Sequence, residues 1–280
     1  GAFDYAGHVR VYEYSNNSWS QLGSDIDGEA YGDNSGISVS MDSAGDRVAI
    51  GGHANDGAFD YAGHVRVYEY SNNSWSQLGS DIDGEAYGDY SGISVSMNSA
   101  GDRVAIGAYG NDASGSLAGH VRVYEYSNNS WSQLGSDIDG EAEGDYFGYS
   151  VSMDSAGDRV AIGAHYNDGT DSNAGHVRVY EYGNSSWTQL GSDIDGEAAS
   201  DYFGYSVSMD SAGDRVAIGA YGNDGTGSYA GHVRVYEYSN SSWSQLGSDI
   251  DGEAADDRSG RSVSMDSAGD RVAIGGPYND

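Results

Sequence analysis

The 280 residues include 44 acidic and 12 basic side chains, so the formal net charge is −32. This charge repels nucleic acid phosphates and anionic lipid head groups, which excludes nucleic acid as a partner. The sequence contains no Cys, which excludes disulfides and zinc–thiolate sites, and no run approaches the roughly 18 consecutive apolar residues of a membrane-inserting span.

A single pattern repeats along the whole chain. The tripeptide Ala-Gly-His recurs every 56 residues, with its Gly at positions 7, 63, 119, 175 and 231. The C-terminal GGPYND followed by the N-terminal GAFDY reproduces the pattern of Gly51–Tyr61. We therefore expect residues 1–280 to form one domain of five near-identical repeats, circularly closed, with the two ends meeting in one inter-strand loop.

Each repeat predicts four strands. In chain order they are His8–Tyr14, Trp19–Leu22, Ile37–Met41 and Arg47–Gly51, each rich in Val, Ile, Tyr or Trp and bounded by Gly, Asn, Asp or Ser. The intervening letters SNNS and DSAGD are typical of tight hairpin turns. No segment shows the periodicity of a helix.

Repeated sets of four short antiparallel strands are typical of a β-propeller. Val48 and Ile50 point to one face of their strand, and Ala49 and Gly51 point to the other. A bulky face against a small face allows neighbouring sheets to nest. We predict an all-β, five-bladed β-propeller of four-stranded antiparallel blades, with a longer array or an open solenoid as the alternative.

The segment FGYSVSMDSAGDRVAIGA (Phe147–Ala164) and the later GHVRVYEY resemble the FG-GAP repeat, the unit of the seven-bladed propeller of integrin α-subunits. Phe147 and Gly148 match the first half of that motif, and Gly163 and Ala164 match the second. The resemblance implies a propeller and, by analogy, a binding function.

The repeats also depart from that family. Ser35, Ser91 and Ser259 stand where Phe is expected. The family's calcium loop is not carried over to Asp42 or Asp46, because DSAGD is too short and offers too few oxygen ligands.

Differences between the copies concentrate in two places, the loop after Arg47–Gly51 and the residues that precede Ile37–Met41. Antiparallel geometry brings both to the same end of the sheets. We interpret this end as a face that binds a protein or carbohydrate ligand, with tolerated drift in loops as the alternative. Its residues are His53, Tyr109, His165, Tyr166, Tyr221, Tyr278, Arg258 and Arg261.

The recurring GSDIDGEA gathers carboxylates that alternate along an extended segment and so point to one side. They offer weak Ca²⁺ sites, one per blade, or simply a solvated acidic rim; no cofactor is required. The residues are Asp25, Asp27, Glu29, Asp81, Asp83, Glu85, Asp137, Asp139, Glu141, Asp193, Asp195, Glu197, Asp249, Asp251 and Glu253.

Three further residue types recur once per repeat. The His that opens the strand at His8 is interpreted as structural, hydrogen-bonded to a neighbouring loop. The Trp that opens the strand Trp19–Leu22 is expected to cover the outer edge of its blade, with sugar stacking as the alternative. N-glycosylation sequons fall in the SNNS turn, at Asn16, Asn72, Asn128, Asn184 and Asn240.

The five copies offer symmetry rather than a set of unlike catalytic groups. We therefore predict no catalytic residue and no enzyme. The expectation is an extracellular or cell-surface recognition or structural module, a glycoprotein in which Ca²⁺ is optional. The alternatives are a lectin-like carbohydrate-binding propeller, or a repeating building block of a surface fibre or adhesin that self-assembles or belongs to a longer tandem array.

Overall fold

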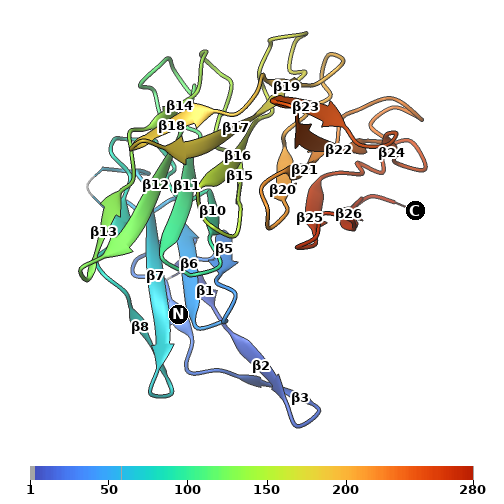
Figure 1. Cartoon of the computed structure of the whole chain (residues 1–280). Helices are drawn as coiled ribbons and strands as arrows, with labels where there is room; N and C mark the ends of the chain where they lie inside the picture. The colour runs from blue at the N-terminus through green and yellow to red at the C-terminus, as the bar shows by residue number, and fades with distance from the viewer. Residues whose placement is uncertain (1–3, 58, 280) are drawn as a thin grey trace.

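The computed structural model describes residues 4–57 and 59–279, and every regular element within these ranges is a β-strand. The strands form antiparallel sheets that recur along the chain, and Figure 1 shows them following one another from blue to red. The predicted all-β class and the 56-residue repeat are therefore confirmed.

Four sheets are complete, and each has five strands in the same order. The first sheet contains β5 (Ser38–Met41), β6 (Arg47–Gly52), β7 (His64–Ser71), β8 (Ser74–Gln77) and β9 (Ile82–Asp83). The second contains β10 (Ser94–Met97), β11 (Arg103–Ala108), β12 (His120–Ser127), β13 (Ser130–Gln133) and β14 (Ile138–Asp139). The third contains β15 (Ser150–Met153), β16 (Arg159–Ala164), β17 (His176–Gly183), β18 (Ser186–Gln189) and β19 (Ile194–Asp195). The fourth contains β20 (Ser206–Met209), β21 (Arg215–Ala220), β22 (His232–Ser239), β23 (Ser242–Gln245) and β24 (Ile250–Asp251).

The two predicted hairpins form as expected. In the SNNS turn between β7 and β8, Asn72 and Asn73 both have positive φ angles, 51° and 64°, which a two-residue hairpin of this hand requires. In the DSAGD turn, the carboxylate of Asp42 accepts hydrogen bonds from the backbone N–H groups of Asp46 and Arg47, at 3.0 Å each.

The fifth strand of each sheet was not predicted. β9 is only two residues long and pairs with the start of β7, with Asp83 opposite His64 and Ile82 opposite Val65. Its Ile is buried in the joint between sheets. The pairing brings the acidic GSDIDGEA segment beside the recurring His, which the sequence alone did not indicate.

The two ends of the chain hold partial sheets. At the N-terminus β1 (His8–Val9) pairs with β4 (Ile26–Asp27), and β2 (Tyr12–Ser15) pairs with β3 (Ser18–Gln21). At the C-terminus β25 (Ser262–Met265) and β26 (Val272–Gly275) form a two-stranded sheet.

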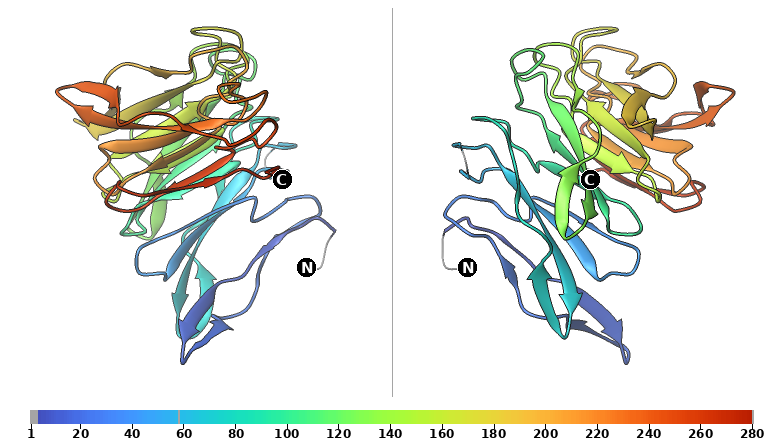
Figure 2. Two further views of the ribbon diagram at one scale, coloured as in Figure 1. Left: turned by 90° about the vertical axis from the view of Figure 1, so that its right-hand side faces the viewer. Right: turned by 60° about the vertical axis from the view of Figure 1, so that its left-hand side comes forward.

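The predicted circular closure is not present in this structure. No pairing among the described strands joins β26 to β1 or β2, and Figures 1 and 2 show the blue and red ends apart along an open arc. The same joint is repeated between successive sheets, so its angle fixes how many units complete a turn. That angle is a property of packing between sheets, and the period of the sequence does not encode it.

The core lies between neighbouring sheets. Ala105 of one sheet and Val160 and Ile162 of the next belong to one buried cluster, which confirms the predicted packing of a small face against a bulky face. The first strands of successive sheets contact one another, so β5, β10, β15, β20 and β25 lie innermost along the arc.

A methionine pair tests the open arc. Met97 at the end of β10 is 7% exposed, whereas the equivalent Met41 of β5 is 42% exposed because no sheet packs outside it. We expect Met97→Ala to lower the free energy of unfolding by about 2–5 kcal/mol and Met41→Ala to lower it by less than about 1 kcal/mol. Urea unfolding followed by circular dichroism measures both; equal losses would indicate that Met41 is covered in solution.

Candidate functional site

The predicted ligand face is a continuous cluster of aromatic side chains at one end of the inner strands. Each sheet contributes residues from just before its first strand and from the loop after its second strand. We call the cluster the aromatic face; it comprises Tyr90, Tyr109, Tyr146, Tyr149, His165, Tyr166, Tyr202, Tyr205 and Tyr221.

One row of rings runs across three sheets. Tyr90 stacks on Tyr109 with ring centroids 5.1 Å apart and an interplanar angle of 2°. Tyr109 lies 5.2 Å from Tyr146 of the next sheet. Two sheets along, Tyr202 stacks on Tyr221 at 5.0 Å and 8°. The repeat thus places equivalent rings in register, so that they form one surface.

A second row lies beside the first and surrounds a histidine. The His165 ring is 4.5 Å from Tyr149 and 5.2 Å from Tyr205. The Tyr149 hydroxyl donates a hydrogen bond to the Tyr205 hydroxyl at 3.2 Å. His165 is 2% exposed, and its Nδ1 has no hydrogen-bond partner among the described residues.

Burial keeps this face uncharged at neutral pH. It lowers the pKa of His165 to about 3 and raises the pKa of Tyr109 and of Tyr221 to about 12. Burial also raises the pKa of Tyr149. The imidazole and the phenols are therefore neutral groups that can bind an uncharged, partly apolar ligand.

Two arginines give the C-terminal end of the face a positive charge. The Arg261 guanidinium lies 5.1 Å from the Tyr205 ring centroid and 5.5 Å from that of Tyr221. Arg258 lies 4.8 Å from the centroid of Tyr278. A cavity of about 500 Å³ borders Tyr205 and Arg261; its other lining residues are Ser262, Gly275, Gly276 and Pro277.

The structure brings most of the predicted ligand-face residues together. His53 joins the cluster through Tyr90, at 6.0 Å between centroids, and Tyr278 pairs with Arg258. The sequence analysis omitted the tyrosines that precede or open the first strands: Tyr90, Tyr146, Tyr149, Tyr202 and Tyr205. Their 56-residue spacing was the available signal, because it places them beside the loop residues that were chosen.

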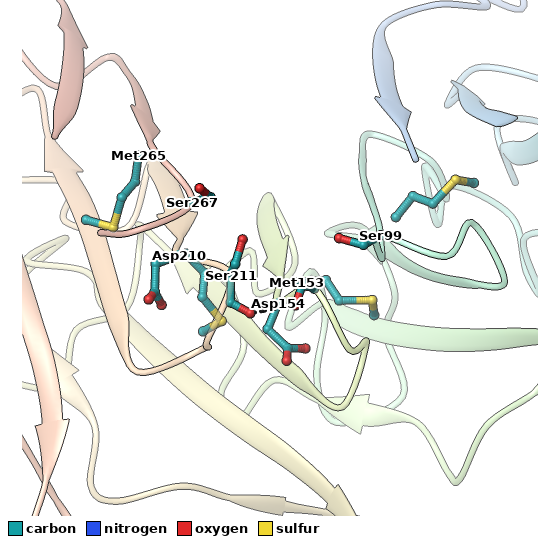
Figure 3. Close-up of a pocket in the computed structure, with 10 residues that line it drawn as sticks. Ser99, Met153, Asp154, Asp210, Ser211, Met265 and Ser267 are labelled. Atoms are coloured by element: carbon teal, nitrogen blue, oxygen red, sulfur yellow. Dashed lines mark hydrogen bonds between the residues drawn. The ribbon is translucent and has the colours of Figure 1, made fainter. Parts of the chain in front are cut away.

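The opposite end of the inner strands has a smaller cavity, of about 220 Å³. Figure 3 shows Met153, Asp154, Ser211 and Met265 around it. Backbone hydrogen bonds run from sheet to sheet here, from Ser99 N to Ser155 O at 3.1 Å and from Ser155 N to Ser211 O at 3.2 Å. These groups hold neighbouring sheets together, so we assign this end a structural role.

The carboxylates of one predicted calcium site form ion pairs with different arginines. Asp25 forms an ion pair with Arg10 at 2.8 Å and accepts a hydrogen bond from Gln21. Glu29 pairs instead with Arg66 of the next sheet at 3.0 Å. Calcium binding by Asp25, Asp27, Glu29 and their equivalents stays a prediction.

The recurring Trp and Asn residues lie at the outer ends of the sheets. The indole N–H of Trp131 donates to the Leu78 carbonyl at 2.7 Å, which places this ring over the joint between two sheets. The sequon residue Asn72 lies in an exposed turn, and glycosylation there stays a prediction.

Two segments, residues 137–180 and 193–236, match the family model of the FG-GAP repeat. Two of the repeats of this chain are therefore similar to the FG-GAP repeat. The matched segments end within β17 and β22, where GHVRVYEY recurs, at residues 180 and 236. The search of curated proteins found no match.

Two solved structures are similar in fold to this chain. The periplasmic gluconolactonase PpgL of Pseudomonas aeruginosa aligns with a TM-score of 0.60 and 13% identity, over 95% of this chain and 70% of that one. A Bacteroides uniformis protein described as a "putative 6-phosphogluconolactonase" aligns with a TM-score of 0.57 and 12% identity, over 90% and 67% of the two chains. At these identities the likeness shows a propeller-like fold. No helix in the described part of this chain could cross a membrane.

These comparisons correct the predicted function. The sequence analysis predicted a non-enzymatic recognition or structural module, with a lectin or a fibre unit as alternatives. Two solved structures that resemble this chain are described as lactonases, so the prediction of no enzyme is wrong. The prediction of no enzyme rested on the symmetry of the strands, whereas the residues that differ between repeats lie in the loops.

The buried His165 predicts a dependence of stability on pH. Its folded pKa, about 3, lies below the unfolded value near 6.5, so stability is fully present above pH 6.5 and falls as the unfolded state binds a proton. At pH 5 this loss is about 2 kcal/mol. The variant His165→Tyr, with the residue found at Tyr109 and Tyr221, should show a smaller difference in unfolding free energy between pH 8 and pH 5. An unchanged difference in His165→Tyr would contradict the prediction.

Proposed function

We propose that this chain is a hydrolase that opens sugar-derived lactones, with its active site where the aromatic face meets Arg261. The observation that carries the proposal is a guanidinium against an uncharged aromatic surface: Arg261 lies beside Tyr205 and Tyr221, on a cavity of about 500 Å³. The likeness to gluconolactonases supports the same reaction class by analogy of fold.

The aromatic face suits the shape and polarity of such a substrate. A sugar lactone is an uncharged cyclic ester with C–H groups on its ring faces and hydroxyl groups at its edge. Tyrosine rings pack against the C–H faces, and their hydroxyls form hydrogen bonds at the edge. Tyr205 and Tyr221, whose rings are 4.6 Å apart at 76°, offer one ring face and one ring edge next to Arg261.

Arg261 supplies the charge that lactone hydrolysis requires. Water adds to the carbonyl carbon, and the C=O electron pair moves to oxygen, which becomes an oxyanion. The ring C–O bond then breaks, and the ring oxygen takes one proton of the added water to become a hydroxyl. The second water proton passes to solvent, and the carbonyl group becomes a carboxylate. A guanidinium beside this carbon stabilises the oxyanion and then the carboxylate.

We assign His165 a positioning role. Its pKa near 3 makes it a weak base at neutral pH, so no proton transfer is assigned to it. The ring fills the space between Tyr149 and Tyr205 and thereby fixes the second row against which Arg261 lies. The proposed catalysis therefore rests on binding and on the electrostatic effect of Arg261.

The proposal also includes the number of blades, which is five. The N-terminal strands β1–β3 carry the third and fourth strands of a blade, and β25–β26 carry the first and second. Together with the four complete sheets, these two halves make five.

A lactone assay tests the proposed function. The rate of acid release from glucono-δ-lactone is measured in a pH-stat, with the spontaneous rate in buffer subtracted. We expect the protein to accelerate ring opening and Arg261→Gln to lower kcat by about 100-fold. Arg271, whose side chain is 85% exposed, gives the matched control: Arg271→Gln should keep the wild-type rate.

Two outcomes would overturn the proposal. One is a rate equal to that of buffer for the unphosphorylated and the 6-phosphorylated lactone. The other is an Arg261→Gln variant with wild-type kcat. Circular dichroism of each variant checks that a lost rate does not reflect a lost fold.

A further inference from the structure

A histidine and two carboxylates converge at the joint between neighbouring sheets. The histidine opens the third strand of a sheet, one carboxylate comes from an Asp of the same repeat, and the other comes from a Glu of the preceding repeat. The four triads are Glu29–His64–Asp81, Glu85–His120–Asp137, Glu141–His176–Asp193 and Glu197–His232–Asp249.

The distances within a triad are close to those of a metal site. His176 Nδ1 lies 3.7 Å from a Glu141 oxygen and 3.9 Å from an Asp193 oxygen. In every triad one nitrogen and two oxygens lie within 4.8 Å of one another. Zinc binds nitrogen and oxygen ligands at about 2.0–2.2 Å in a tetrahedron, which holds ligand atoms about 3.4 Å apart. The two distances from His176 Nδ1 exceed this separation by only a few tenths of an ångström.

The imidazoles are buried without a hydrogen-bond partner. His120, His176 and His232 are each 1% exposed, and their Nδ1 atoms have no partner among the described residues. The expected hydrogen bond to a neighbouring loop is therefore not found. A buried polar atom left unpaired costs about 1–3 kcal/mol, and an ion at this position would remove that cost.

The imidazoles are also in the form that binds metals. Burial lowers the pKa of His120 and of His176 to about 4, so both are neutral at pH 7 and keep a free lone pair. Metal binding to such a group displaces no proton at neutral pH.

An arginine orients the carboxylates without occupying the whole triad. Arg178 contacts the second oxygen of Glu141, and its Nη2 donates to the Asp193 oxygen that faces His176, at 3.2 Å. Arg178 Nε donates to the other Asp193 oxygen, also at 3.2 Å, and Gln189 donates to that same oxygen at 2.6 Å. The Glu141 oxygen that faces His176 has no described contact with Arg178 and accepts a hydrogen bond from Asn167 at 3.2 Å. Outer groups of this kind commonly fix the ligands of a metal, and the surrounding charge of −32 offsets the repulsion between Arg178 and a cation.

We propose that each of these joints binds one dication of the zinc class through the His Nδ1 and one oxygen from each carboxylate, with water in the remaining position. The Glu comes from one repeat, and the His and Asp come from the next repeat, so the ion links neighbouring sheets. An imidazole ligand favours zinc, copper or nickel over calcium. This site therefore differs in ligands and in metal from the predicted calcium site of Asp25, Asp27 and Glu29, and it is independent of the proposed lactonase activity.

The first repeat supplies a natural control. His8 has the same sequence neighbours as His176, but it is exposed. Its triad does not form within residues 4–57 and 59–279.

Metal titration of the whole chain tests the proposal. The protein is stripped with EDTA, and Zn²⁺ binding is measured by isothermal titration calorimetry, with Co²⁺ as a spectroscopic probe. We expect four ions per chain, the visible absorption of tetrahedral Co²⁺, and a rise in Tm with Zn²⁺ but not with Ca²⁺. His176→Gln should remove one equivalent of Zn²⁺, and His8→Gln should remove none.

Each result that would contradict the proposed metal site has a different meaning. Binding of Zn²⁺ that Ca²⁺ displaces equally well would indicate adventitious binding to surface carboxylates, and an unchanged stoichiometry in His176→Gln would exclude the histidine as a ligand. Glu141→Gln keeps the packing of its side chain while removing a ligand oxygen's charge, so it should also lose one equivalent. If it does not, the triad is an ion-pair network held by Arg178.

Discussion

The contact on which the rest of the structure depends joins a glycine to a backbone carbonyl of the neighbouring sheet. A Cβ added to Gly51, Gly163 or Gly219 would lie 2.0 Å from a carbonyl oxygen of the next sheet, and one added to Gly107 would lie 1.9 Å from its counterpart. Only glycine permits this approach. It brings the small face of one sheet onto the Val and Ile side chains of the next, and a serine hydroxyl completes the contact, as Ser150 does by donating to the Gly204 carbonyl at 2.8 Å. Burial of the core follows from this spacing.

Both candidate sites follow from repetition of this joint. Because each sheet is placed on its neighbour in the same way, equivalent loop residues come into register, and Tyr109 meets Tyr146 across a joint. The same register sets Glu141 of one repeat beside His176 of the next. The strands are nearly identical, so chemical differences come from the loops. Arg261 occurs where the other copies have Ile or Tyr, and it gives the aromatic face its single polarised end.

The local features were predictable from the sequence, and the long-range ones were not. Alternation in Val48–Gly51 indicated a bulky and a small face, and the SNNS and DSAGD letters indicated the hairpins. The two-residue strand β9 was missed because two residues carry no periodicity. The open ends were missed because closure depends on the angle between sheets, which no local pattern encodes. The triads were missed because Glu29 and His64 meet only after two repeats pack together, and the function was mispredicted because symmetry was given more weight than Arg261 and the tyrosines beside it.

The most direct test of the joint compares Gly163→Ala with Gly275→Ala by the free energy of unfolding. At position 163 the new methyl group would meet the carbonyl of Gly204, which is backbone and cannot turn away, whereas at position 275 it would meet only the Ser262 hydroxyl, which can rotate. The account predicts a loss of about 3 kcal/mol or more for Gly163→Ala and less than about 1 kcal/mol for Gly275→Ala. Equal losses would show that the ends close on each other in solution, and no loss in either variant would show that the glycine contact does not set the spacing of the sheets.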